Sequence, residues 1–176
     1  MPERREPRRS ELTVGYRIPG PAMDLAAKVL VKAAPDLRPP VAVRTEGDAP
    51  LFVDVGDPAN RLAKLIEQVT AEAAGSGIGN VAVICPQSVY EEVVVGFEAA
   101  GVSIGRAPKD GLDHQITAVP VNLVKGLEVD VAVVVEPSLI VAEEPQGYRS
   151  LYVAMTRATK RLVLVHAQPL PDVLAG

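Results

Sequence analysis

Three short runs dominated by Val, Leu, Ile and Ala constrain the fold of this chain more than any other feature. They occupy residues 81–85 (VAVIC), 130–135 (DVAVVV) and 161–166 (RLVLVH). Runs of strand length without a polar face are typical of parallel β-strands buried on both sides. Helical segments separate them, and parallel strands need crossover connections of about a dozen residues. We therefore predict an α/β domain of three layers, with a mostly parallel sheet between helices on both faces.

Weaker local patterns predict the remaining elements. Asp57 is a suitable N-cap, and Pro58 a suitable first residue, for a helix that runs to about residue 74. Further helices are predicted at 21–34, 87–100 and 147–157, and further strands at 12–14, 51–55, 102–104 and 116–119. Loops are expected at 75–80 (GSGIGN) and 105–115, and an extended Pro-rich segment at 38–50.

The length and charge of the chain limit its organisation. Its 176 residues suffice for one domain with its own core. We expect that domain at 11–170, between a disordered basic tail at 1–10 and a short tail at 171–176. The net charge of −4 excludes a domain that is basic over its whole surface, so any contact with DNA has to be local.

The single cysteine and the N-terminus indicate a compartment. Cys85 cannot form an internal disulfide, and we expect it in the core of a protein from a reducing compartment. No apolar stretch follows the basic N-terminus, so no signal peptide is predicted. The apolar runs are too short to span a membrane. We therefore expect a cytoplasmic protein without membrane contact.

Several patterns for enzymatic chemistry are missing. The loop GSGIGN lacks the Lys and the Ser or Thr of the phosphate-binding pattern GxxxxGK[ST], so we interpret it as a turn. Without that pattern, we interpret Glu136 as the end of a strand rather than as a Walker B acid. His114 and His166 lie far apart and outside any metal-ligand cluster, so no metal site is predicted.

The predicted topology also indicates where a ligand would bind. In open parallel sheets, ligands bind outside the carboxyl ends of the strands. We therefore expect functional loops at 15–17, at 120–128 and from residue 137 onward.

Three segments carry a family resemblance, in the order that the family has them. They are LTVGYRIPGPAMDLAAKVL (12–30), VPVNLVKGLEVDVAVVVEP (119–137) and LYVAMTRATKRLVL (151–164). They resemble motifs IV, V and VI of UvrD/Rep-type superfamily 1 DNA helicases and together span nearly the whole chain. The resemblance implies the second, C-terminal RecA-like domain of such a helicase, which lacks the P-loop.

The resemblance implies a role for individual residues. Arg17 and Arg157 match the family's two arginines at the γ-phosphate of ATP, and Arg157 is the arginine finger that stabilises charge during phosphoryl transfer. Tyr16 matches a tyrosine near the adenine. Glu128 matches a contact to the ribose hydroxyls, and the small Gly126 would let the backbone approach a ligand.

The chain also departs from the family pattern. Pro120 and Asn122 stand where the family has Thr-x-His next to the DNA strand, which leaves Asn122 and Lys125 as candidate nucleic-acid contacts. Only a short loop at 106–115 stands where UvrD and Rep insert an accessory subdomain. This compact form is closer to a helicase D-like branch, whose members bind RNA polymerase.

These observations lead to two hypotheses of function. In the first, the chain is part of an ATP-dependent DNA helicase or translocase, and it completes an ATP site with an N-terminal RecA-like domain. That domain would bring the P-loop and Mg²⁺, so this chain is not expected to hydrolyse ATP alone. In the second, the chain is a catalytically inert module that docks to RNA polymerase or another nucleic-acid machine. A fragment, a split-gene product and a degenerate paralogue all remain open.

Overall fold

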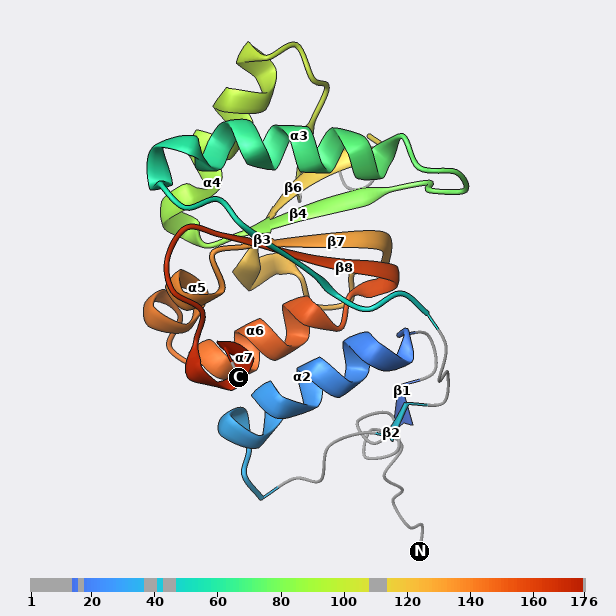
Figure 1. Ribbon diagram of the computed structural model, residues 1–176, viewed down its shortest axis with the longest axis vertical. Helices are drawn as coiled ribbons and strands as arrows, with labels where there is room; N and C mark the ends of the chain where they lie inside the picture. Colours follow the sequence, from blue (N-terminus) through green and yellow to red (C-terminus); the bar gives the residue numbers. More distant parts are fainter. Residues whose placement is uncertain (1–13, 16–17, 37–40, 43–46, 108–113, 176) are drawn as a thin grey trace, which may run out of the picture.

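One parallel sheet of six strands organises the residues that the structure describes (Figure 1). The computed structural model describes residues 14–15, 18–36, 41–42, 47–107 and 114–175. The order of strands across the sheet is β3 (Leu51–Asp54), β8 (Ala158–His166), β7 (Val129–Val135), β4 (Val81–Cys85), β6 (Ile116–Pro120) and β5 (Gly105–Arg106). All the pairings between them are parallel. A separate parallel pair consists of β1 (Val14–Gly15) and β2 (Val41–Ala42).

Helices cover both faces of the sheet, which confirms the predicted three-layer α/β architecture (Figure 1). One face carries α3 (Arg61–Ala73) and α4 (Gln87–Ala99). The other face carries α2 (Gly20–Ala33), α5 (Pro137–Glu143), α6 (Gly147–Met155) and the short α7 (Asp172–Ala175). Two 3₁₀ turns, η1 (Pro58–Asn60) and η2 (Val121–Leu123), precede α3 and β7.

The continuous apolar runs are explained by two cores, one on each side of the sheet. In β7, Ala132 and Val134 pack toward α2 and α6, whereas Val131 and Val133 pack toward α3 and α4. Because successive side chains of a strand point to opposite faces, a strand with a core on both sides needs apolar residues at every position. Cys85 is fully buried, as predicted, and burial raises the pKa of its thiol well above the usual range.

Most predicted elements are confirmed to within one or two residues, but the strand predicted at 102–104 is wrong. The amide of Val102 donates to the carbonyl of Phe97 at 2.9 Å, so the chain here is still tied to the end of α4. Gly101, with a φ of 78°, turns the chain, and pairing with β6 starts only at Gly105. The helix start predicted at Asp57 is also refined. The Asp57 carboxylate accepts from the amide of Ala59 and caps the turn η1, and α3 begins only after that turn.

Some predictions concern residues outside the described part of the chain. These are the basic tail at 1–10, two residues of the strand at 12–14, and most of the extended segment at 38–50. Elsewhere, the segment from 137 onward is helical rather than a loop, because Pro137 begins α5. None of the helices in the described part has both the length and the hydropathy needed to cross a lipid bilayer.

Candidate functional site

The pairing of β7 with β8 brings together two residues from separate motifs. Val129 pairs with Ala158, so the preceding residues, Glu128 and Arg157, are neighbours at the amino ends of the two strands. The amide of Val129 donates to the carbonyl of Arg157 at 3.1 Å, which fixes this arrangement through the backbone. The proximity of the KGLE and TRATKR segments therefore follows from the sheet topology.

This site lies at the edge of the sheet opposite to the one that the topology rule favours. The segment 121–128 leaves the carboxyl end of β6 and enters the amino end of β7, since both strands are parallel. Glu128 therefore lies at the amino edge, whereas Asn122 stays near the carboxyl edge, where its Oδ1 accepts from Nε2 of Gln87 at 2.8 Å. The segment 120–128, which we predict to be a functional loop, therefore contributes to two separate edges of the sheet.

The side chain of Arg157 is held by its own domain through all three guanidinium nitrogens. Nε donates to the carbonyl of Val153 at 2.9 Å, and Nη1 donates to the carbonyl of Leu127 at 3.3 Å. Nη2 donates to Oγ1 of Thr156 at 3.1 Å. Arg157 was predicted on the last turn of the preceding helix, but α6 ends at Met155, so Arg157 instead lies in the link to β8.

Burial and two neighbours set the electrostatics of this arginine. Burial lowers the pKa of Arg157, while Tyr152 and Glu128 act in the opposite direction. Burial raises the pKa of the half-buried Tyr152, and the nearby charge of Arg157 partly offsets that shift. An arginine stays protonated under such perturbations. The site thus holds a partly desolvated cation beside a carboxylate and a phenol.

Gly126 positions one of the acceptors of Arg157. Its φ of 83° lies in the left-handed region, and a Cβ at this position would meet no atom within 4 Å. The glycine is therefore favoured by the backbone conformation rather than by crowding. The turn brings the amide of Leu127 to the carbonyl of Val124 at 2.9 Å, and the Leu127 carbonyl faces Arg157. The neighbouring Lys125 is exposed.

The remaining predicted residues do not join this cluster within the described part of the chain. Tyr16 and Arg17 lie outside the described residues. His114 precedes β6 at the amino edge, whereas His166 ends β8 at the carboxyl edge, where its Nδ1 lies 2.8 Å from the Gln168 carbonyl. Among the described residues, no group of three or more His, Cys, Asp and Glu side chains could hold a metal ion.

The sequence interpretation missed a buried ion pair at the carboxyl edge. Glu136 directly follows β7, has a φ of 49° and is fully buried. Its Oε2 accepts from Nη1 of Arg61 at 2.8 Å and from the amide of Ala167 at 3.0 Å, and its Oε1 accepts from the amide of Gln168 at 3.2 Å. The sequence does show an acidic residue between an unbroken apolar run and a proline, which could have indicated a buried carboxylate. Its partner Arg61, however, lies 75 residues away in the chain.

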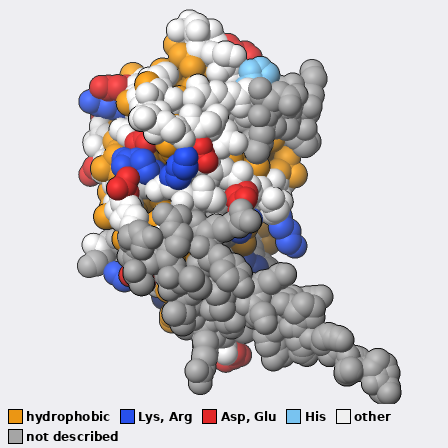
Figure 2. Space-filling view, turned by 90° about the vertical axis from the view of Figure 1, so that its right-hand side faces the viewer, with side chains coloured by type: hydrophobic (Ala, Val, Ile, Leu, Met, Phe, Trp, Pro, Cys, Tyr) orange, Lys and Arg blue, Asp and Glu red, His pale blue; other side chains and the backbone are white. Residues whose placement is uncertain are grey.

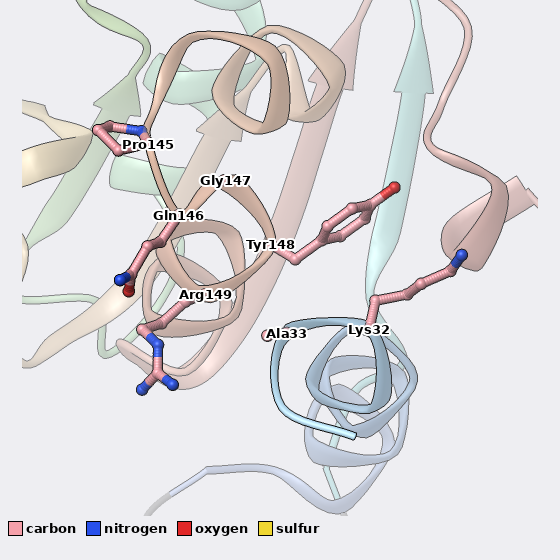
Figure 3. Close-up of a pocket in the computed structure, with 7 residues that line it drawn as sticks. All are labelled: Lys32, Ala33, Pro145, Gln146, Gly147, Tyr148 and Arg149. Carbon is pink, nitrogen blue, oxygen red and sulfur yellow. The ribbon is translucent and has the colours of Figure 1, made fainter. Parts of the chain in front are cut away.

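Two cavities lie outside this cluster. One of about 370 Å³ lies between the end of α2 and the start of α6, at the opposite end of α6 from Arg157 (Figure 3). Its lining residues are Lys32, Ala33, Pro145, Gln146, Gly147, Tyr148 and Arg149. A second, of about 430 Å³, is lined by residues that include Glu72, Lys160 and Arg161.

Figure 2 shows that positive and negative side chains intermingle on the face that carries the amino ends of the strands. Arg161 on this edge pairs with Asp48 and Glu72, and Lys160 pairs with Asp130.

Comparison with solved structures shows that the fold of this chain is similar to that of domains from helicases. The C-terminal domain of a possible DNA helicase from Lactobacillus plantarum superimposes with a TM-score of 0.71 at 20% identity, over 91% of this chain and 92% of that one. The arterivirus helicase, nonstructural protein 10, solved with DNA, matches with a TM-score of 0.51 at 17% identity. That match covers 84% of this chain but only 35% of the viral protein.

A family model matches the C-terminal part of the sequence. Residues 115–165 match the UvrD-like helicase C-terminal domain, which confirms the predicted resemblance over this segment. The segment runs from the start of β6 almost to the end of β8 and contains Glu128 and Arg157. A search of curated proteins found no match.

Proposed function

We propose that this chain is the C-terminal RecA-like domain of an ATP-dependent UvrD-like DNA helicase or translocase. In this proposal it contributes Glu128 and Arg157 to an ATP site that is completed by an N-terminal RecA-like domain. The observation that carries the proposal is the adjacency of these two residues, which the β7–β8 register imposes within the family-matching segment. The P-loop and the bound Mg²⁺ belong to the other domain.

The chemistry of the residues at this edge fits a nucleotide. An ionised carboxylate accepts hydrogen bonds from hydroxyl groups such as those of a ribose, and a guanidinium donates to phosphate oxygens. Glu128 is exposed and Arg157 is only partly buried, so both can be reached from outside the domain. Tyr16 and Arg17 complete the proposed site from the N-terminal motif.

The proposed role of Arg157 is to stabilise the charge that develops on the phosphoryl group during transfer. In related NTPases an arginine finger contributes a factor of about 10³–10⁵ to the rate. Asn122 and Lys125 are the proposed contacts to DNA. The arterivirus helicase with a similar fold was solved with DNA, which supports DNA as the class of partner.

The test is an ATPase assay on this chain combined with a P-loop-containing N-terminal helicase domain and single-stranded DNA. We expect Arg157→Ala to lower kcat by about 10³ or more with little change in KM, since the finger acts in the transition state. The matched control is Arg149→Ala, because Arg149 is exposed at the other end of α6. Unchanged turnover in Arg157→Ala would contradict the finger role.

A second candidate function is a binding module without nucleotide chemistry. The guanidinium of Arg157 donates to Val153, Leu127 and Thr156, and such a set of contacts also suits a purely structural arginine. Under this alternative, RNA polymerase would be captured equally well by the wild-type chain and by Arg157→Ala. Capture that depends on nucleotide and on Arg157 would favour the helicase function instead.

A further inference from the structure

The hydroxyl of Thr156 connects the end of α6 to the guanidinium of Arg157. Thr156 is the C-cap of α6 and is only 8% exposed. Its amide donates to the carbonyls of Tyr152 and Val153, each at 3.2 Å. Its Oγ1 lies 3.0 Å from the Val153 carbonyl and 3.1 Å from Nη2 of Arg157. Thr156 is therefore held by the helix at both its backbone and its side chain.

The direction of the two hydroxyl hydrogen bonds follows from the chemistry of the partners. A carbonyl can only accept and a guanidinium can only donate. The single proton of the Thr156 hydroxyl must therefore point to the Val153 carbonyl, and a lone pair of Oγ1 must face Arg157. Because the hydrogen bond to the Val153 carbonyl fixes the hydroxyl, this lone pair is aimed before any ligand arrives.

The backbone of Arg157 is itself held by two hydrogen bonds. Its amide donates to the carbonyl of Ala154 at 3.3 Å, and its carbonyl accepts from Val129 of β7 at 3.1 Å. The position of its Cα is thus set by α6 on one side and by the sheet on the other. What remains to be fixed is the rotation of the long side chain, which carries a large conformational entropy.

We propose that Thr156 is a positioning residue for Arg157. Its hydroxyl, oriented by the Val153 carbonyl, holds the outer guanidinium nitrogen Nη2 and thereby fixes the plane in which Arg157 presents its remaining N–H groups. The consequence for catalysis rests on the proposed function, whereas the positioning itself is a property of this chain alone. Of the three hydrogen bonds described for the guanidinium, two go to backbone carbonyls and the third goes to the hydroxyl of Thr156, which is adjacent in sequence.

The test is an NMR experiment on the whole chain without any ligand. A guanidinium held by hydrogen bonds gives separate Nη1 and Nη2 signals, whereas a freely rotating one gives averaged signals. The Arg157 signals are assigned by their loss in Arg157→Lys. We expect separate signals in the wild type and in Thr156→Ser, which keeps the hydroxyl.

In Thr156→Val, which keeps the shape but lacks the hydroxyl, the Nη signals should average. The Nε–H should then exchange with water about tenfold faster, a factor that corresponds to 1.4 kcal/mol. Separate signals and unchanged exchange in Thr156→Val would overturn the proposal. If that variant does not fold, Thr156→Ala tests the same contact with the same two outcomes.

The ATPase assay separates this proposal from the proposed function. If both hold, Thr156→Val lowers kcat more than it changes KM, and Thr156→Ser restores kcat. If Arg157→Ala leaves turnover unchanged while the NMR signals respond to Thr156→Val, the helicase role fails and the positioning stands. If the signals do not respond, the positioning fails whatever the ATPase shows.

Discussion

Removing the buried carboxylate of Glu136 at the carboxyl edge of the sheet should strongly destabilise the fold. The side chain is fully buried and accepts three hydrogen bonds, one from Arg61 and two from backbone amides. Breaking a buried ion pair from one side costs about 3–5 kcal/mol, because the remaining charge loses its partner. Each buried donor left without an acceptor costs about 1–3 kcal/mol.

The magnitude expected for Glu136→Ala lies below the simple sum of these contributions. Arg61 keeps a second carboxylate, Glu92, at 3.4 Å, and its own side chain is 13% exposed. We therefore expect a loss of about 3–4 kcal/mol in the free energy of unfolding. Glu136→Gln retains one acceptor oxygen and the shape, so about half of that loss is expected.

The backbone of Glu136 offers a separate measurement. Its φ of 49° lies in the left-handed region, which costs a residue with a Cβ roughly 1 kcal/mol relative to glycine. Glu136→Gly should consequently be less destabilising than Glu136→Ala by about that amount. The order of stability is then wild type, Gln, Gly and Ala.

The assay is urea denaturation, in which a shift of the midpoint at constant slope reports a change in stability. The matched control is Glu67→Ala, because Glu67 is 75% exposed and lies 3.9 Å from Lys64 as a surface ion pair. Its loss should cost less than about 0.5 kcal/mol. A loss below about 1 kcal/mol for Glu136→Ala would refute the reasoning, since the buried carboxylate would then contribute no more than a surface charge.

Two further predictions follow from packing and from titration. In Gly147→Ala, the new Cβ would overlap the backbone carbonyl of Val141, so we expect a loss of about 1–3 kcal/mol in urea denaturation, although alanine normally stabilises a helix. The pKa of Tyr152 is raised in the folded state, so the unfolded state loses this proton first and stability should fall as the pH rises above 10. Tyr152→Phe should flatten that part of the pH profile, and an unaltered profile would show that another group titrates there.

The layers of the fold could be predicted because they depend on local patterns. The apolar run at 81–85 has the same bounds as β4, since a strand buried on both faces needs a continuous run of apolar residues. The start of α4 and the burial of Cys85 could also be predicted from local patterns. The misplaced strand at 102–104 shows the limit, because pairing partners rather than propensity decide where a two-residue strand forms.

For the candidate site, the residues could be predicted from the sequence but their contacts could not. Resemblance to a family placed Glu128 and Arg157 in one site, and the register of β7 with β8 makes them neighbours. The acceptors of Arg157 could not be predicted, because two of them are carbonyl groups whose direction depends on the tertiary structure. The ion pair of Glu136 with Arg61 could not be predicted either, because it joins distant parts of the chain.

The order of strands in the sheet also affects how this domain folds during synthesis. β3 is paired with β8 and with no other described strand of the sheet, and α2 packs on α6 and α7, so two early elements of this domain find their partners late in its sequence. While the chain emerges from a ribosome, β4, β6 and β7 can assemble, but β3 and the apolar side of α2 have nothing to dock on. Completion of the domain therefore waits for β8, and long-range pairing of this kind makes folding slow. Until then the nascent chain exposes apolar surface to which chaperones can bind.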